Sequence, residues 1–207
     1  MARAKTATNF DLEQISNDGA ADIAMPYRVE VVIEGAAPIL FHRWSVEGVE
    51  EKSKAAKGSK AKKTDDWESY LYRDNQSNIC VPGEYFRQAC IEAAKYRQDP
   101  RSPRKSAKDL YKAALISLTD LASTGVAKPD YLDRRRVTVM RAGITRTRPA
   151  LNAGWRATFQ LMIQTPEYIS PQMLNSVIAD AGRLVGIGDF RPSYGRFNVV
   201  GFEVLKQ

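Results

Sequence analysis

The sequence is poor in the residues that most often build catalytic and metal sites. It has one histidine, His42, and only two cysteines, Cys80 and Cys90, which form no Cys-x-x-Cys pair. Neither a disulfide framework nor a zinc site is therefore expected. No Ser-His-Asp or Cys-His arrangement can be assembled convincingly, and no Gly-Lys-Ser/Thr phosphate-binding motif is present. We predict no cofactor and no metal.

Long apolar runs are missing as well. No segment approaches the roughly 18 residues that a helix needs to cross a bilayer. The first 25 residues are polar and of mixed charge, unlike a secretory signal peptide. We therefore expect a cytoplasmic protein with no membrane partner.

Composition favours one folded domain. Of the 207 residues, 43% are hydrophobic and 9% aromatic, which suffices for a core. We expect a mobile N-terminal arm over 1–26 and a single domain over 27–207. A flexible insertion is expected at about 47–66, where six lysines lie among alanine, glycine and serine. It is either a solvated loop or one that becomes ordered on nucleic acid.

The spacing of apolar residues predicts an α+β fold. Strands are predicted over 27–35, 67–72, 78–81, 156–165 and 198–205. Helices are predicted over 82–97, from Ser102 to Gly125 and from Ser170 onward. This order is compatible with a ferredoxin-like or RRM-type antiparallel sheet with helices on one face.

The charge of the chain favours a polyanionic partner. Lysine and arginine outnumber aspartate and glutamate by 31 to 24, for a net charge of +7. Six of these cations, with no acid between them, fall in a predicted β-hairpin at about 134–148 that turns at Ala142-Gly143. They are Arg134, Arg135, Arg136, Arg141, Arg146 and Arg148.

The alternation of side chains along a strand predicts how this hairpin presents its arginines. Arg134 and Arg136 share one face of a strand, as do Arg146 and Arg148 on theirs, so the hairpin would present a cationic ribbon to phosphates. The alternative is an exposed hairpin balanced by acids elsewhere in the fold or on a partner. A second basic segment offers Arg101, Arg104 and Lys105 as further contacts, or simply forms a solvated surface.

The loop over 186–197 is the other candidate contact with nucleic acid. Gly186, Gly188 and Gly195 would allow close approach of the backbone. Arginines suit phosphates and aromatic rings suit unpaired bases, and the loop carries both types: Arg191, Arg196, Tyr194 and Phe190. The alternative is a tight connection in which Tyr194 and Phe197 cap the core. A dinucleotide-binding turn is not supported, because the loop follows a helix rather than a strand.

Two segments resemble the CRISPR-associated RAMP proteins. Residues 79–89, ICVPGEYFRQA, resemble their strand, Pro-Gly and helix motif, and residues 186–197 resemble their C-terminal glycine-rich loop before the last strand. The opening strand, 27–41, is similar to their first strand. Cas7-like backbone subunits fit best, over about half of the chain. Many members have Ser-Ser and Lys-Gly where this chain has Glu84-Tyr85 and Arg87-Gln88, so Arg87 keeps the cation. A distant relative is expected, with a phage-borne origin left open.

The resemblance implies sequence-tolerant binding of single-stranded RNA in a groove by subunits stacked side by side. We predict a non-catalytic nucleic-acid-binding protein that forms a homo-oligomer or filament, with other complex subunits as further partners. RNA is favoured over DNA by the resemblance alone. The alternatives are a single-stranded DNA-binding or annealing protein of a recombination system, and a RAMP-type endoribonuclease.

An endoribonuclease would use His42 or Asp66 as its catalytic residue. A lone histidine at the end of a strand more simply has a packing role. An acidic doublet that closes a lysine-rich loop more simply balances charge or caps a helix.

Overall fold

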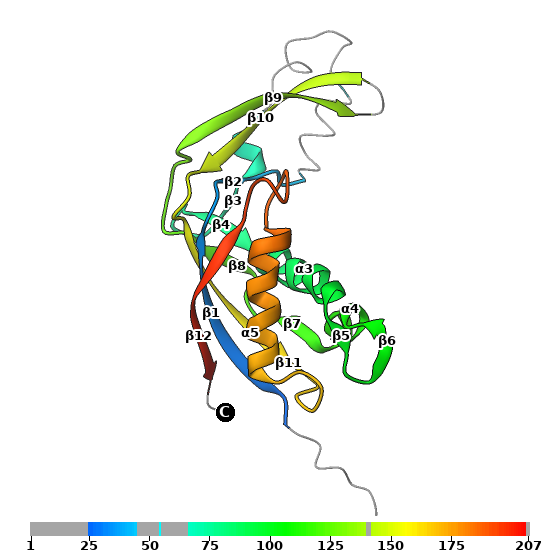
Figure 1. The fold of residues 1–207 in the computed structure, drawn as a ribbon. Coiled ribbons are helices and arrows are strands. Elements are labelled where there is room, and N and C mark those ends of the chain that lie inside the picture. The colour runs from blue at the N-terminus through cyan, green and yellow to red at the C-terminus, as the bar shows by residue number, and fades with distance from the viewer. Residues whose placement is uncertain (1–24, 45–53, 55–65, 140–141, 206–207) are drawn as a thin grey trace, which may run out of the picture.

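The structure, a computed structural model, describes residues 25–44, 54, 66–139 and 142–205 (Figure 1). The predicted N-terminal arm and nearly all of the lysine-rich insertion lie outside these ranges. An antiparallel four-stranded sheet with the order β12-β1-β11-β7 forms the centre. Its strands are β1 (Tyr27–Gly35), β7 (Leu115–Ser117), β11 (Arg156–Ile163) and β12 (Phe197–Leu205).

Alternation along the sequence places this sheet against the core. Val29, Val31 and Ile33 of β1 are fully buried, whereas the residues between them are partly exposed. This is the period-two pattern of a strand with one covered face. The predicted strands over 27–35, 156–165 and 198–205 are confirmed.

The covered face of the sheet carries the helices. Helix α3 (Gly83–Ala93), extended by η2 (Ala94–Tyr96), packs against α5 (Pro171–Asp180), which is extended by η3 (Ala181–Val185). Phe86 of α3 stacks on Phe159 of β11 with ring centroids 4.4 Å apart. Ser170 begins α5 as expected, since its hydroxyl accepts the backbone N–H of Met173. None of the described helices is long and apolar enough to span a membrane.

Smaller sheets surround this centre. The strands β9 (Tyr131–Val139) and β10 (Ala142–Leu151) form a long hairpin that pairs with β2 (Ile39–Leu40) and extends beyond one end of the molecule. A second sheet contains β3 (Tyr72–Arg73), β4 (Ile79–Pro82) and β8 (Leu121–Ser123), and a third contains β5 (Gln98–Asp99) and β6 (Ser102–Ser106). The fold is therefore α+β with several antiparallel sheets.

The predicted helix from Ser102 to Gly125 is largely wrong. Only α4 (Lys108–Ala114) is helical; residues 102–106 form β6, residues 115–117 form β7 and residues 121–123 form β8. Leu115, Ile116 and Ser117 pair with β11, and these sheet hydrogen bonds come from a segment distant in sequence. Apolar spacing over so short a run does not separate a helix from a strand, so tertiary pairing decides.

Two local predictions also differ from the structure. Residues 68–70 of the strand predicted over 67–72 form a 3-10 turn, η1 (Glu68–Tyr70), and only Tyr72 and Arg73 pair as a strand. The hairpin does not turn at Ala142-Gly143, because these residues already pair with Val139 and Thr138. The predicted hairpin itself is confirmed.

Candidate nucleic-acid interface

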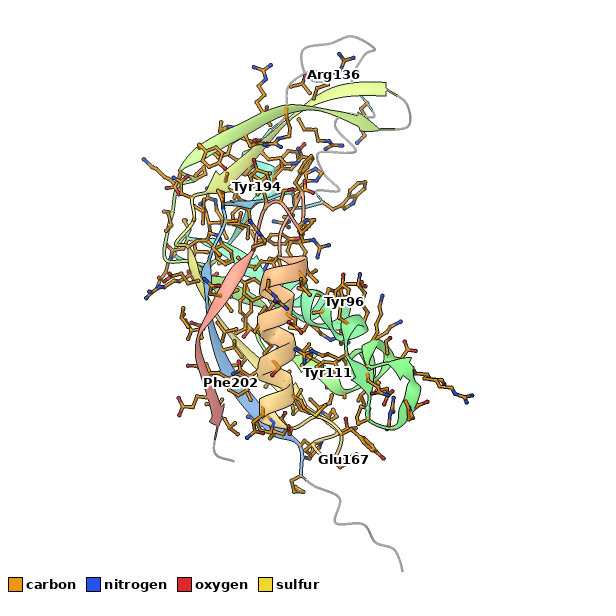
Figure 2. All side chains as sticks on the ribbon, viewed as in Figure 1. Tyr96, Tyr111, Arg136, Glu167, Tyr194 and Phe202 are labelled. Carbon is orange, nitrogen blue, oxygen red and sulfur yellow. The ribbon has the colours of Figure 1, made fainter. Side chains whose placement is uncertain are left out.

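The hairpin divides its arginines between two faces. Arg135 pairs across the strands with Arg146, and Asp133 pairs with Arg148, so these four side chains share one face. We call it the inner face, because it meets β2 and the loop over 186–197. Arg134 and Arg136 lie on the opposite, outer face; both are exposed, and no hydrogen bond or ion pair joins their side chains to another described residue. In Figure 2, Arg136 lies on the projecting hairpin, whereas Tyr194 lies where the hairpin joins the body.

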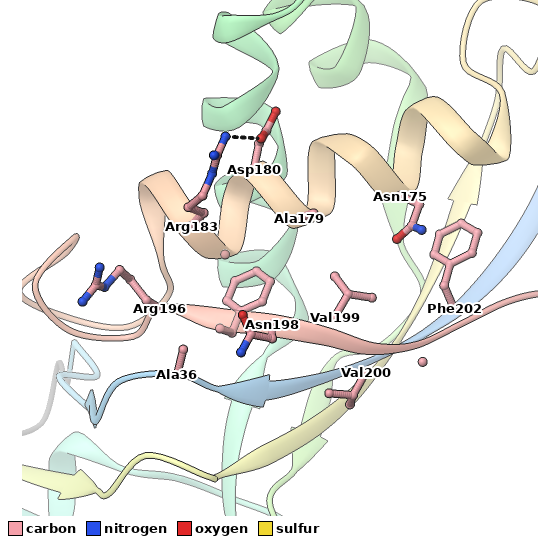
Figure 3. A pocket seen from close by; sticks show the side chains of 13 residues that line it. Ala36, Asn175, Ala179, Asp180, Arg183, Arg196, Asn198, Val199, Val200 and Phe202 are labelled. Carbon is pink, nitrogen blue, oxygen red and sulfur yellow. Dashed lines mark hydrogen bonds and ion pairs between the residues drawn. The ribbon is translucent and has the colours of Figure 1, made fainter.

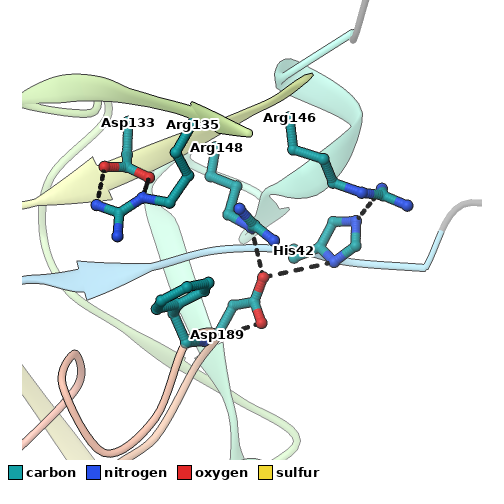
Figure 4. Close-up of polar contacts among 7 residues, drawn as sticks. His42, Asp133, Arg135, Arg146, Arg148 and Asp189 are labelled. Carbon is teal, nitrogen blue, oxygen red and sulfur yellow. Dashed lines mark hydrogen bonds and ion pairs between the residues drawn. The ribbon is translucent and has the colours of Figure 1, made fainter. Parts of the chain in front are cut away.

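A chain of polar contacts crosses the inner face (Figure 4). Nη1 of Arg146 lies 2.9 Å from Nε2 of His42, and Nδ1 of His42 lies 3.6 Å from a carboxylate oxygen of Asp189. The same oxygen accepts a hydrogen bond from Nε of Arg148 at 2.5 Å. Because a guanidinium only donates, Nε2 of neutral His42 is the acceptor from Arg146. These contacts join β2, β10 and the glycine-rich loop.

The glycines shape the loop against its own chain. Gly188 and Gly195 have φ values of 82° and 71°, and a Cβ on Gly195 would lie 1.7 Å from the carbonyl oxygen of Ile187. The loop also pairs with the neighbouring segment, since Asp189 and Gly195 donate backbone N–H groups to Leu40 and Pro38. Close approach at these glycines is therefore to protein backbone. The result is a loop held firmly under the hairpin.

Aromatic rings and guanidinium groups meet where the loop faces the hairpin. The guanidinium of Arg135 lies 4.9 Å from the ring centroid of Phe190 and 5.1 Å from that of Tyr194, and it donates to the Tyr194 hydroxyl at 2.6 Å. The guanidinium of Arg148 lies 5.7 Å from the Phe190 centroid. Phe190 nevertheless remains 43% exposed. A half-open ring flanked by cations suits stacking by a flat, electron-rich ligand.

Acidic partners hold two of these arginines in place. Asp133 accepts from Nε of Arg135 at 2.6 Å, and this hydrogen bond raises the pKa of the guanidinium further above its usual range. Asp189 accepts a hydrogen bond from Nε of Arg148, whereas Nη1 of Arg148 is buried and has no hydrogen-bond partner within the described chain. An unsatisfied buried donor is uncommon in proteins and leaves one bond available to an acceptor.

A cavity of about 330 Å³ opens beside this cluster. Its lining residues are His42, Tyr85, Gln88, Gly188, Asp189 and Arg191. Burial and the hydrogen bond with Tyr72 raise the pKa of the Tyr85 hydroxyl, so it stays neutral and able to donate. Arg191 is exposed. The cavity thus combines a cation, Arg191, with the carboxylate of Asp189 and the polar side chains of Tyr85 and Gln88.

Several residues predicted to contact nucleic acid lie elsewhere. Arg87 is half-buried and donates to the carbonyl oxygens of Leu115 at 2.6 Å and Lys112 at 2.8 Å, so it ties α3 to the end of α4. Arg196 is exposed but lines a different cavity, of about 830 Å³, between α5 and β12 (Figure 3). Arg141 lies outside the described residues.

The second basic segment is also remote from the inner face. Arg101 forms an ion pair with Asp99 at 2.7 Å, and Arg104 and Lys105 are exposed on β6. Figure 1 shows β5 and β6 on the far side of the helices from the hairpin. The structure therefore does not join this segment to the hairpin cluster.

The two candidate catalytic residues, Asp66 and His42, contact different parts of the structure. Asp66 accepts the backbone N–H of Glu68 at 3.2 Å at the start of η1, as expected for a cap. His42 instead belongs to the polar chain with Arg146 and Asp189. The described residues contain no group of three or more histidine, cysteine, aspartate or glutamate side chains arranged to hold a metal ion.

Sequence reasoning missed the two acids that organise the inner face. Asp133 directly precedes the arginine run, and Asp189 is the single acid in the glycine-rich loop. A single acid within a basic segment indicates a residue that pairs with the neighbouring cations. The sequence does not show which cation it pairs with. Asp189 reaches residues 41 positions away along the chain.

Comparison with known proteins yields likeness in structure but no match in sequence. No protein-family model matches the chain, and no curated protein matches it in sequence. The structure is similar to a chain of the type III-B Cmr-beta complex, solved by cryo-EM bound to cognate target RNA, with a TM-score of 0.49 and 11% sequence identity. The likeness covers 88% of this chain but only 61% of the Cmr-beta chain. Similarity at this level does not identify what the protein binds.

Proposed function

We propose that the protein binds single-stranded nucleic acid where the inner face of the hairpin meets the glycine-rich loop, and that it does not cleave the strand. RNA is the expected polymer, following the resemblance to Cas7-like RAMP proteins. Single-stranded DNA is the alternative, as for an annealing protein.

The half-exposed ring of Phe190 between two guanidinium groups carries this proposal. Its open part is available to a base, and stacking of one base on an aromatic side chain contributes about 1–3 kcal/mol. The rings of Phe190 and Tyr194 meet edge to face with centroids 6.2 Å apart, so the platform is already arranged. A paired base has no free face to offer, which favours single strands.

The arginines differ in whether an acidic side chain pairs with them. Arg135 and Arg148 are neutralised by Asp133 and Asp189, so they position the aromatic platform. Phosphates are left to exposed cations without an acidic partner in the described chain: Arg191 in the loop, and Arg134 and Arg136, which the strand reaches by passing over the edge of the hairpin to its outer face. Contacts to phosphate and stacking on any base carry little sequence information, which supports sequence-tolerant binding.

We also propose that the central sheet is a ferredoxin-like, RRM-type unit. The order across the sheet is β12-β1-β11-β7. If these four strands are numbered 1 to 4 along the chain, this order is 4-1-3-2. Helices α3 and α4 separate the first two strands, and α5 separates the last two. This arrangement supports the assignment. The β9–β10 hairpin would then be an insertion that carries the binding face.

Binding is tested with fluorescently labelled oligomers of one sequence, prepared as single-stranded RNA, single-stranded DNA and RNA duplex. We expect single strands to bind tighter than duplex, and log affinity to fall with log salt by about 0.7 per phosphate neutralised. Arg134→Glu with Arg136→Glu should make the salt dependence of the affinity shallower. Phe190→Ala should weaken binding without changing that salt dependence. The matched control is Arg104→Glu with Lys105→Glu on remote β6. Equal loss in the control, or no salt dependence, would contradict the proposal.

Absence of cleavage is tested separately. Nε2 of His42 accepts from Arg146, so its lone pair is not free to take a proton from a substrate. Labelled RNA should stay full length during incubation with the protein, with or without a chelator. Cleavage that disappears in His42→Ala or Asp66→Ala would support the endoribonuclease instead.

Side-by-side assembly along a strand is the expected oligomer, following the same resemblance. Light scattering of the protein alone and with long single strands tests it. We expect the mass of the complex to increase in steps of one subunit as the strand lengthens. One subunit per strand at every length would exclude this assembly.

A further inference from the structure

We infer that the strand-binding surface continues past the glycine-rich loop into a second cavity, where Tyr96 and Lys95 at the end of α3 hold the next part of a single strand. This inference rests on the proposed function. It adds a stacking residue and a phosphate contact on the helical layer.

The two cavities flank one segment of the loop. The second cavity, of about 540 Å³, shares Gly188, Asp189 and Arg191 with the first. Its lining also includes Phe190 of the loop and Lys95 and Tyr96 of η2. A strand that leaves the hairpin side therefore reaches the end of α3 by crossing the exposed side chain of Arg191.

Tyr96 offers a stacking surface that packing does not use. Its side chain is 57% exposed although it lies at the edge of the helical core (Figure 2). The ammonium of Lys95 lies 4.8 Å from its ring centroid. Phe190 and Arg191 line the same cavity, so it presents two exposed aromatic rings together with an exposed cation. Rings and cations on one surface match the bases and phosphates of a single strand.

The cavity offers cations to a ligand although two acids, Glu92 and Asp189, line it. Asp189 forms an ion pair with Arg148, which lines neither cavity. Glu92 accepts a hydrogen bond from Lys108 at 2.7 Å, and this contact, with nearby Lys95 and Arg191, lowers the pKa of its carboxyl group. Its charge is thus balanced from outside the cavity. Lys95 and Arg191 form no ion pair within the described chain, so both cations are available to phosphates.

Tyr168 provides a matched control. It is another exposed tyrosine, at 39%, and the guanidinium of Arg101 lies 5.7 Å from its ring centroid. It lines neither cavity, and its neighbour Glu167 lies at the opposite end of the molecule from the hairpin (Figure 2). Tyr96→Ala and Tyr168→Ala remove the same chemistry from two different surfaces.

The experiment measures the affinity of the full chain for a single-stranded RNA long enough to cross both cavities. Tyr96→Ala should weaken binding about five- to 150-fold, as for loss of one stacked base. Lys95→Ala should reduce the salt slope by about 0.7, as for one phosphate. Tyr168→Ala should bind like the unaltered protein. RNA carrying 5-iodouridine should crosslink to Tyr96 under ultraviolet light, and thermal melting should show that all variants are folded.

The outcomes separate this inference from the proposed function. If the unaltered protein binds and Phe190→Ala weakens binding, but Tyr96→Ala and Lys95→Ala do not, the second cavity is not part of the site and the proposed function stands. Equal losses in Tyr96→Ala and Tyr168→Ala also overturn the inference. If the unaltered protein binds no single strand, both fail.

Discussion

Arg135 and Arg146 stand directly opposite each other in the β9–β10 hairpin, two like charges in one cross-strand pair. Such pairs are destabilising unless each charge has its own partner. Here Asp133 and Tyr194 accept from Arg135, whereas His42 accepts from Arg146. The pair therefore persists because the inner face supplies acceptors, and the glycine-rich loop supplies one of them.

Arg135→Ala and Arg136→Ala should differ although the residues are neighbours. Arg135→Ala leaves the Asp133 carboxylate and Tyr194 hydroxyl without their donor, which we expect to lower the free energy of unfolding by about 1–2 kcal/mol. Arg136→Ala, on the outer face, should change it by less than about 0.5 kcal/mol. Urea unfolding measures both. Equal effects would contradict the division of the hairpin into two faces.

Gly195→Ala and Gly125→Ala separate backbone strain from crowding. Both glycines have a φ of 71°, so alanine at either site adopts the left-handed region at a cost of about 1–2 kcal/mol. At Gly125 the new Cβ meets nothing within 4 Å, whereas at Gly195 it lies 1.7 Å from the Ile187 carbonyl oxygen. We expect Gly195→Ala to be clearly the more destabilising in thermal melting. Similar melting temperatures would show that the loop yields without cost.

Ser170→Ala should shorten or weaken α5. The hydroxyl of Ser170 accepts the Met173 N–H at 3.3 Å, and loss of such a cap costs about 1 kcal/mol. Ser176→Ala, within the same helix on an exposed turn, is the control and should be neutral or slightly stabilising, because alanine has the higher helix propensity. Chemical unfolding of the two variants measures the difference. A loss in Ser176→Ala as large as in Ser170→Ala would argue against capping.

The two cysteines should be unreactive while the protein is folded. Both are buried, and burial raises the pKa of the Cys90 thiol to about 12 and that of Cys80 above its usual range. The reactive thiolate is therefore scarce at pH 8. Iodoacetamide should add no mass to the native protein and two carbamidomethyl groups to the unfolded one. Rapid modification of the native protein would contradict this burial.

The hairpin shows how much of the inner face could be predicted from the sequence. Six arginines without an intervening acid identified it, and strand alternation correctly placed Arg134 and Arg136 together. Alternation does not say which face meets the rest of the molecule. That face is selected by the glycine-rich loop, which follows more than 40 positions later and brings Asp189 beneath Arg148.

Local signals alone determined β1, α3 and the start of α5. The alternation of Val29, Val31 and Ile33 and the cap at Ser170 depend on neighbours within a few residues, so their physical cause is contained in the sequence. Tertiary structure decided the rest. Residues 115–117 became a strand because β11 offered backbone partners, and Phe190 became a half-open platform because Arg135 and Arg148 converge on it from the hairpin. Such outcomes depend on distant segments competing for the same hydrogen bonds and charges, and that competition takes place only in the folded chain.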